Sequence, residues 1–243
     1  MDDIVILAGG ECKPDLAAIS GVPNRADIPF DGKTFLQIAY DAVKPLGEPL
    51  IVGGTGSTYK RQIPGGNSFV ESIGIAANEI SSDRFLLVFA DLPFLTTEAV
   101  AEFLKNCNQS AEVNYPIIPI EDCQRDFPNL KRTTVKIAEG EFTGGNIGFF
   151  DRKAILNSLP LLEKLYSVRK SPFKLAKLLG LKTFSLLAQA SLNPTKVPKS
   201  RFEAAISELL QLKVEGVIVH QSGIGTDIDN AEQYQQIFQF QKS

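Results

Sequence analysis

The sequence lacks several features that would place it in a specialised class of protein. It has one histidine, no tryptophan and three cysteines, Cys12, Cys107 and Cys123, which are far apart and form no CxxC pair. This pattern argues against a disulfide framework or a structural zinc site and favours reduced thiols in the cytoplasm. No apolar run approaches the ~18 residues of a membrane-spanning helix, and the first residues do not resemble a secretory signal. We therefore expect a cytoplasmic protein with no membrane partner.

Positive charge is not in excess either. The 25 Lys and Arg residues are outnumbered by 28 Asp and Glu residues, which gives a net charge of −3. Such a chain has no uniform positive field for duplex nucleic acid. Its scattered aromatic residues offer no stacking platform for single strands. We therefore expect small-molecule partners and no nucleic acid.

The chain does contain a regular alternation of strand and helix patterns. Short apolar runs at residues 4–7, 50–52 and 85–90 are typical of buried strands. Helical spacing follows at residues 35–43, at residues 69–80 and from Thr96 or Thr97 onward. This alternation predicts an α/β fold with a mostly parallel sheet between two layers of helices. No linker or repeat divides the chain, so we expect one domain over residues 1–243.

The second half of the chain is less regular. From about Tyr115 the alternation breaks into two proline-rich turns. Further strands are expected at residues 134–138, 147–150 and 214–220, and further helices at residues 154–165, 173–179, 202–212 and 231–240.

Two common nucleotide-binding motifs are present only in incomplete form. Gly32, Lys33 and Thr34 end like a P-loop, but Asp27 stands where the first glycine of that motif is required. Gly54 and Gly56 begin like a dinucleotide fingerprint, but Tyr59 occupies the position of its third glycine. Both motifs are therefore excluded.

The carboxyl ends of parallel strands meet at one edge of a sheet, where ligands bind. Residues 8–33, 64–68 and 91–95 are expected to meet there. Gly9 and Gly10 allow close approach of the backbone to a phosphate group. Asn67 and Ser68 lie where the cap of the second helix belongs, so that helix start is a candidate contact for a base or ribose.

Several sequence blocks resemble a known enzyme family. They are LAGG at residues 7–10, NRADIPFDGKT at 24–34, FADLPFLT at 89–96, GGNIGFF at 144–150 and GTDIDNAEQY at 225–234. In this order they are similar to the nucleotidyltransferases of the molybdenum cofactor guanylyltransferase and sugar-phosphate nucleotidyltransferase type. The resemblance covers most of the chain and implies a glycosyltransferase-A-like, nucleotide-diphospho-sugar transferase fold.

The resemblance also implies roles for individual residues. Arg25 falls on the family's phosphate-binding lysine, and Lys33 belongs to its GK pair. Asp91 and Asp229 fall on its two metal-binding positions. The base and ribose would be framed by Leu7, Ala8, Gly9, Gly10, Asn67 and Ser68, and the acceptor would face Gly145 and Asn146, within an acceptor-side portion at roughly residues 112–200. The chain departs from the family pattern soon after LAGG, where it has only Lys13 in place of an arginine.

Elementary chemistry agrees with these roles. Moving a nucleotidyl group requires charge neutralisation on the α-phosphate and on the departing pyrophosphate. Mg²⁺ is commonly held by one or two carboxylates together with substrate phosphates. Asp91 and Asp229 would supply those carboxylates, with Arg25 on the leaving phosphates. Asp229 has an alternative role as the cap of the last helix, in which case Asp227 is the candidate ligand.

We therefore expect a Mg²⁺-dependent nucleotidyltransferase that moves an NMP unit from an NTP to a phosphorylated acceptor. The alternatives are a glycosyltransferase that uses a nucleotide sugar, and a catalytically silent nucleotide-binding protein. A basic cluster at Arg169, Lys170, Lys174 and Lys177 is either a solvated helix face or an acceptor-phosphate site. His220 is expected to be a strand-end or core residue rather than a catalytic base.

Overall fold

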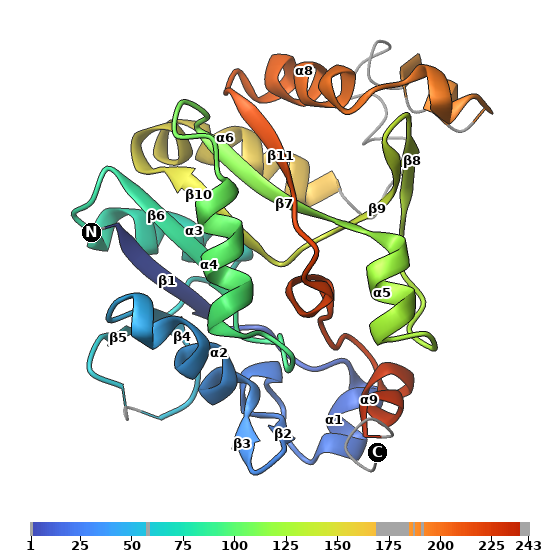
Figure 1. The fold of residues 1–243 in the computed structure, drawn as a ribbon. Coiled ribbons are helices and arrows are strands. Elements are labelled where there is room, and N and C mark those ends of the chain that lie inside the picture. The colour runs from blue at the N-terminus through green and yellow to red at the C-terminus, as the bar shows by residue number, and fades with distance from the viewer. Residues whose placement is uncertain (1, 57–58, 169–184, 187, 191, 239–243) are drawn as a thin grey trace.

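The computed structural model describes residues 2–56, 59–168, 185–186, 188–190 and 192–238. Its centre is a nine-stranded sheet with the strand order β5-β4-β1-β6-β10-β7-β9-β8, to which β11 adds beside β7 (Figure 1). The strands are β1 (Asp3–Ala8), β4 (Leu50–Gly53), β5 (Gln62–Ile63), β6 (Arg84–Phe89), β7 (Val113–Pro119), β8 (Val135–Ile137), β9 (Gly140–Gly144), β10 (Ile147–Asp151) and β11 (Val214–Ile218). The half that contains β5, β4, β1 and β6 is parallel, and β10 joins it antiparallel to β6.

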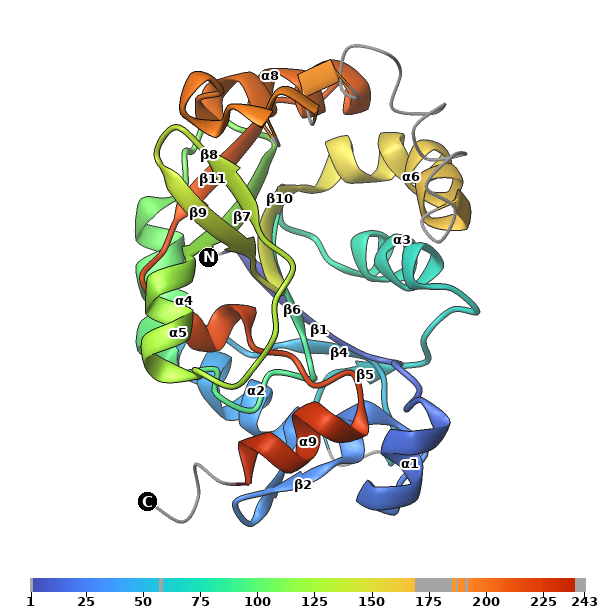
Figure 2. The same cartoon turned by 90° about the vertical axis from the view of Figure 1, so that its right-hand side faces the viewer.

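Helices cover both faces of the parallel half (Figure 2). On one face, α2 (Phe35–Val43) and α4 (Thr97–Asn106) share a core with Ile4 and Ile6 of β1. On the other face, α3 (Phe69–Glu79) and α6 (Arg152–Val168) share a core with Val5 and Leu7. Successive side chains of a strand point to opposite faces, so the continuous apolar run of β1 supplies both layers. This confirms the predicted α/β architecture.

Side-chain caps fix where three of these helices begin. The hydroxyl groups of Thr34, Ser68 and Thr96 accept hydrogen bonds from the amides of Gln37, Glu71 and Ala99. Each cap satisfies a backbone donor that the first helical turn leaves unpaired. The predicted cap at Ser68 is confirmed.

The prediction of turns after Tyr115 is wrong, because this region contains the strand β7. It lies inside the sheet, between β10, β9 and β11. Pro116 and Pro119 obscure it in the sequence, since proline cannot donate to a strand ladder. The carbonyl group of Pro116 nevertheless accepts a hydrogen bond from the amide of Gly145.

The remaining helices include two that the sequence patterns did not indicate, α1 (Pro14–Ser20) and α5 (Ile120–Asp126). The structure also describes α8 (Lys199–Leu210) and α9 (Ala231–Ile237), short 3-10 segments η1 (Arg25–Asp27), η2 (Lys44–Leu46), η3 (Pro194–Lys196) and η4 (Ser222–Gly225), and a small ribbon of β2 (Pro29–Phe30) and β3 (Lys33–Thr34). The predicted helix at 173–179 lies outside the described residues. Among the described helices, none is long and apolar enough to cross a bilayer.

The end of the described chain packs against its beginning. Tyr234 and Ile237 of α9 are buried in a cluster with Leu16 of α1, Ile28 and Phe30. Figure 2 shows α9 above β2 and beside α1. This packing carries the segment before α9 to the carboxyl edge of the parallel strands.

Candidate active site

Arg25 is positioned by the loop that follows β1. The loop folds back on itself, because the amide of Arg25 donates to the carbonyl of Gly10 at 2.8 Å and the amide of Cys12 donates to the carbonyl of Pro23 at 2.7 Å. The side chain of Arg25 lies against Gly10, where there is no Cβ atom to displace it. The guanidinium group thus lies at the carboxyl end of β1.

Asp91 follows β6, the neighbouring parallel strand. The amide of Ala90 donates to the carbonyl of Leu7 at 3.0 Å, so the pairing of β6 with β1 extends up to Asp91. Only 7% of Asp91 is exposed. A carboxylate buried to this extent needs a compensating charge.

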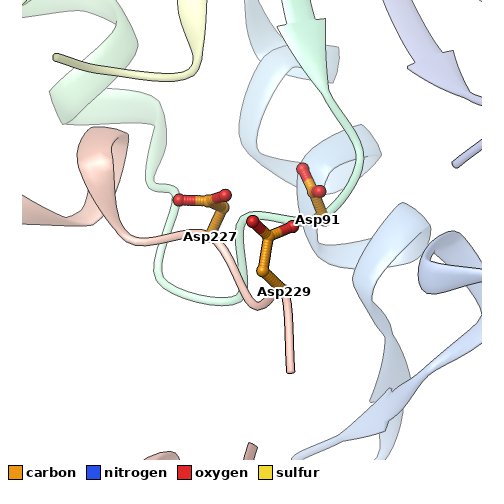
Figure 3. Close-up of side chains that lie close together, drawn as sticks. All are labelled: Asp91, Asp227 and Asp229. Carbon is orange, nitrogen blue, oxygen red and sulfur yellow. The ribbon is translucent and has the colours of Figure 1, made fainter. Parts of the chain in front are cut away.

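Asp227 and Asp229 come from the segment between η4 and α9. The side-chain amide of Asn146 donates to Asp227 at 3.0 Å. The cap of α9 is Asn230, whose side chain accepts from the amide of Gln233. The alternative role of Asp229 as a helix cap therefore does not apply, and its side chain faces Asp91 (Figure 3).

The three carboxylates form one compact cluster. One oxygen from each of Asp91, Asp227 and Asp229 lies within 4.8 Å of the others. The Nη1 atom of Arg25 bridges two of them, at 2.5 Å from Asp91 and 2.7 Å from Asp229. Three negative charges and one positive charge leave the cluster with an excess of negative charge.

Burial and this excess of negative charge raise the pKa values of two of the carboxyl groups. Burial raises the pKa of Asp91 to about 6, which Arg25 opposes and the charges of Asp227 and Asp229 reinforce. Burial and the neighbouring charge of Asp229 also raise the pKa of Asp227. Carboxylates that repel each other in a partly buried site favour a bound cation.

The cluster fits the requirements of Mg²⁺. This ion takes oxygen ligands at about 2.0–2.1 Å, so two ligands of one ion are separated by no more than about 4.2 Å. The oxygens present are of the right chemical type, and side-chain adjustments of less than about 1 Å would bring them to that separation. Asp91, Asp227 and Asp229 are thus the residues that could hold such an ion.

A cavity of about 760 Å³ lies on one side of the cluster, and we call it the glycine-loop cavity. Its lining includes most of the residues expected to frame a nucleotide, namely Leu7, Ala8, Gly9, Gly10, Arg25, Asn67, Ser68 and Asp91. It also includes an aromatic wall that sequence reasoning missed, in which the ring of Phe69 lies 5.5 Å from that of Phe89 and 5.7 Å from that of Tyr166. These residues are distant in sequence, and no local motif marks them.

A second cavity of about 600 Å³ lies on the other side, and we call it the hairpin cavity because the β8–β9 hairpin forms one wall. Asn146, Asp227 and Asp229 line one end of this cavity. At that end the cavity meets the cluster of Asp91, Asp227 and Asp229, which we call the acidic cluster. Arg132, which the sequence patterns did not single out, also lines the cavity. The guanidinium of Arg132 donates to the carbonyl of Gly225 and, at 2.6 Å, to the hydroxyl of Thr226.

Two of the predicted site residues do not line either cavity. The ammonium group of Lys33 pairs with Asp41 at 2.7 Å. Gly145 is buried, and an added Cβ atom there would lie 2.7 Å from Ile224 and 2.8 Å from Pro116. Gly145 therefore shapes the turn that presents Asn146. The basic residues 169, 170, 174 and 177 lie outside the described part of the chain.

His220 lies at the exposed end of β11, away from both cavities. Its Nδ1 atom is 2.7 Å from the carboxylate of Asp122, which also pairs with Arg125 at 2.6 Å. Its placement agrees with the expectation of a strand-end residue.

Comparison with solved structures identifies the class of fold. The chain is similar to 2-C-methyl-D-erythritol 4-phosphate cytidylyltransferase from Thermus thermophilus, with 14% identity and a TM-score of 0.57 over 100% of both chains. It is also similar to CMP:2-keto-3-deoxy-manno-octonic acid synthetase, with 12% identity and a TM-score of 0.57 over 100% of this chain and 99% of that one. The fold is therefore that of the nucleotide-diphospho-sugar transferases.

Sequence comparison identifies the family. Residues 4–163 match the model of the MobA-like NTP transferase domain, so the chain belongs to this family and is a nucleotidyltransferase. A hypothetical transferase from Thermus thermophilus is 27% identical, with a TM-score of 0.86 over 96% of this chain and 99% of that one. No curated protein matches the sequence.

Proposed function

We propose that this protein is a Mg²⁺-dependent enzyme that transfers an NMP unit from an NTP to a phosphorylated small-molecule acceptor. The observation that carries the proposal is the cluster of Asp91, Asp227 and Asp229, which lies between two cavities and is bridged by Arg25. In the reaction, an oxygen of the acceptor phosphate bonds to the α-phosphorus of the NTP. The bond from that phosphorus to the bridging oxygen breaks, and pyrophosphate leaves.

The NTP occupies the glycine-loop cavity. Backbone amides of residues 8–10 and the guanidinium of Arg25 face its phosphates, because both lie at the carboxyl edge of β1. Ser68 and the start of α3 lie near the ribose. The aromatic wall of Phe69 and Tyr166 offers the base a stacking surface.

Mg²⁺ bound by Asp91, Asp227 and Asp229 would neutralise charge that develops on the phosphates. Arg25 lines the glycine-loop cavity and contacts Asp91 and Asp229. We assign it to the departing pyrophosphate. At neutral pH, a pKa of about 6 leaves Asp91 mostly ionised and able to act as a ligand.

The acceptor occupies the hairpin cavity. Asn146 and Arg132 line its polar end together with Asp227. Arg132 supplies the positive charge that a phosphorylated acceptor requires. The similar cytidylyltransferase from Thermus thermophilus is named for a phosphorylated compound, which supports an acceptor of this kind. The cytoplasm stays the expected compartment, and the thiols of Cys12, Cys107 and Cys123 are all free.

The test is pyrophosphate release with each of the four NTPs and Mg²⁺ against a panel of phosphorylated acceptors. We expect Asp91→Asn to lower kcat/KM by at least 100-fold. The matched control is Asp122→Asn, because Asp122 is as buried as Asp91, with 8% exposure, but lines neither cavity. Unchanged turnover in Asp91→Asn would remove this residue from the mechanism.

The same assay separates the alternatives. A glycosyltransferase would release a nucleoside diphosphate from a nucleotide sugar and no pyrophosphate from an NTP. A silent nucleotide-binding protein would bind an NTP in calorimetry without turnover of any acceptor.

A further inference from the structure

The hairpin cavity has one polar end and a long apolar body. Its polar end consists of Asn146, Thr226, Asp227 and Asp229, with Arg132 beside them. Away from these residues, hydrocarbon side chains from β7, the β8–β9 hairpin and α8 line the wall, together with Lys131, two threonines and the charged group of Lys199, Glu203 and Glu215. The hydrocarbon side chains are Ile117, Val135, Ile137, Phe142, Phe202 and Ile206.

Tyr115 of β7 also lines the cavity, and it is one of three lining residues with an exposed fraction that is high for their type. Tyr115 is 41% exposed, Val135 is 43% exposed and Ile206 is 38% exposed, and they come from three different elements. Large apolar side chains that converge on one concavity indicate a binding surface. Figure 1 shows α8 and the β8–β9 hairpin on the same side of β7 and β11.

Of the charged residues along this body, Lys199, Glu203 and Glu215 are paired with one another, whereas Lys131 is exposed. The ammonium group of Lys199 pairs with Glu203 and, at 3.1 Å, with Glu215, and it donates to the carbonyl of Gly216 at 2.8 Å. Glu203 also accepts from the amide of Gly216 at 2.8 Å. A sugar body would need several free donors and acceptors beside α8 and β11, where these three charged groups already bind one another, since a buried hydroxyl group without a partner is costly.

From this arrangement we propose that the acceptor is an alcohol monophosphate with a hydrocarbon body, such as an alkyl or prenyl monophosphate. The phosphate lies at the acidic cluster beside Arg132, and the hydrocarbon lies along Ile117, Phe142 and Ile206. This inference rests on the proposed function and specifies its acceptor.

A homologous series of acceptors tests the proposal. With NTP and Mg²⁺ saturating, kcat/KM is measured for n-butyl, n-hexyl and n-octyl phosphate and for glycerol 3-phosphate and ribose 5-phosphate. Each buried CH₂ group multiplies affinity by about fourfold. We expect n-octyl phosphate to exceed n-butyl phosphate and both polar phosphates by at least tenfold.

Two surface variants test whether the dependence of kcat/KM on alkyl chain length arises in the hairpin cavity. Ile206→Glu places a carboxylate in the apolar wall, and we expect it to lower kcat/KM for n-octyl phosphate at least tenfold with the KM for NTP unchanged. Ile19→Glu is the matched control, because Ile19 is 40% exposed on α1 and lines neither cavity. It should retain the full dependence on chain length.

The outcomes distinguish a failure of the hydrocarbon acceptor from a failure of nucleotidyl transfer. Turnover of ribose 5-phosphate with no gain along the alkyl series overturns the hydrocarbon acceptor and leaves nucleotidyl transfer intact. If no acceptor is turned over, equilibrium dialysis of radiolabelled n-octyl phosphate shows whether the hydrocarbon site exists. Binding weakened by Ile206→Glu and not by Ile19→Glu supports the hydrocarbon site although the transfer reaction fails, and no binding overturns it. A dimer that Ile206→Glu dissociates without change in alkyl phosphate binding would assign the surface to self-association.

Discussion

The absence of a side chain at Gly10 determines where the guanidinium of Arg25 lies. A Cβ atom at position 10 would be 2.7 Å from Nη2 and 2.9 Å from Nε of Arg25, closer than non-bonded atoms pack. Gly10→Ala therefore displaces the guanidinium from Asp91 and Asp229 without removing its charge. In the proposed reaction the displaced guanidinium no longer donates to the departing pyrophosphate. We expect kcat for pyrophosphate release to fall at least tenfold, because a hydrogen bond to a charged group contributes about 1.5–3 kcal/mol.

A double-mutant cycle shows whether Gly10 acts through Arg25. If it does, adding Gly10→Ala to Arg25→Ala lowers kcat no further. If the two losses instead add, the new methyl group obstructs the nucleotide itself.

Asp3 contributes to stability far from the site, at the start of β1. It accepts hydrogen bonds from the amide and hydroxyl of Ser82, from the amide of Ser81 and from the guanidinium of Arg61. Burial would raise the pKa of Asp3, but the hydrogen bonds from Ser82, Arg61 and Ser81 outweigh it and lower the pKa below 3.8. The bonds from Ser81 and Ser82 join β1 to the turn that precedes β6, and the bond from Arg61 joins it to the residue before β5.

We expect Asp3→Asn to lower the free energy of unfolding at pH 7 by about 1–2 kcal/mol, since charge-assisted hydrogen bonds are lost. A carboxyl group whose pKa is lower in the folded state stabilises the fold above its unfolded pKa, and this contribution disappears as the pH falls through the folded pKa. The difference between the two proteins should therefore shrink below about pH 4. Urea denaturation between pH 7 and pH 3 measures it, and a constant difference would assign the loss to packing.

At the scale of elements, two helix caps allow stability to be separated from function. Ser68 caps α3 and lines the glycine-loop cavity, whereas Thr96 caps α4 and lines neither cavity. Replacing either residue with alanine should cost about 1 kcal/mol of stability. Only Ser68→Ala should also raise the KM for NTP, by several-fold. Equal KM values for the two variants would place the nucleotide away from the start of α3.

Local patterns were sufficient to predict the elements of the parallel half. The apolar runs of β1, β4 and β6 are buried on both faces, and the caps of α3 and α4 have short polar side chains. The strand β7 was not predictable in this way, since prolines interrupt its pattern. Its partners β10 and β11 lie far along the chain, so its position depends on tertiary pairing.

The same distinction applies to the site. Asp91 was predictable because it directly follows a clear strand, and the resemblance of residues 225–234 to a family block pointed to Asp229. That Asp227 joins them, and that Lys33 pairs instead with Asp41, depends on how the loops pack. Arg132 and the wall of the hairpin cavity carry no local motif at all, because their residues come from several separate segments.

At the scale of the whole molecule, the site depends on contact between distant parts of the chain. Arg25 and Asp229 are separated by 204 positions and are brought together by the packing of α9 against α1 and β2. The family model covers residues 4–163, so Asp227, Asp229 and α8 all lie beyond it. Apart from Tyr166, the lining of the glycine-loop cavity thus lies within the part of the chain that the family model matches, whereas the hairpin cavity also includes residues beyond it.

This arrangement predicts that Mg²⁺ and Arg25 compete for the same carboxylates in the absence of nucleotide. Mg²⁺ at 100 times its Kd should stabilise the protein by about 2.7 kcal/mol, which raises Tm by about 5–10 °C for a chain of this size. Arg25→Ala removes the counter-charge from Asp91 and Asp229, so its Tm without Mg²⁺ should be lower than that of the wild type and its rise on adding Mg²⁺ should be larger. Asp229→Asn should show a much smaller rise, while Asp122→Asn should respond like the wild type. Scanning calorimetry with EDTA and with increasing Mg²⁺ measures all four proteins, and a smaller rise in Arg25→Ala would show that the guanidinium assists the cation instead of competing with it.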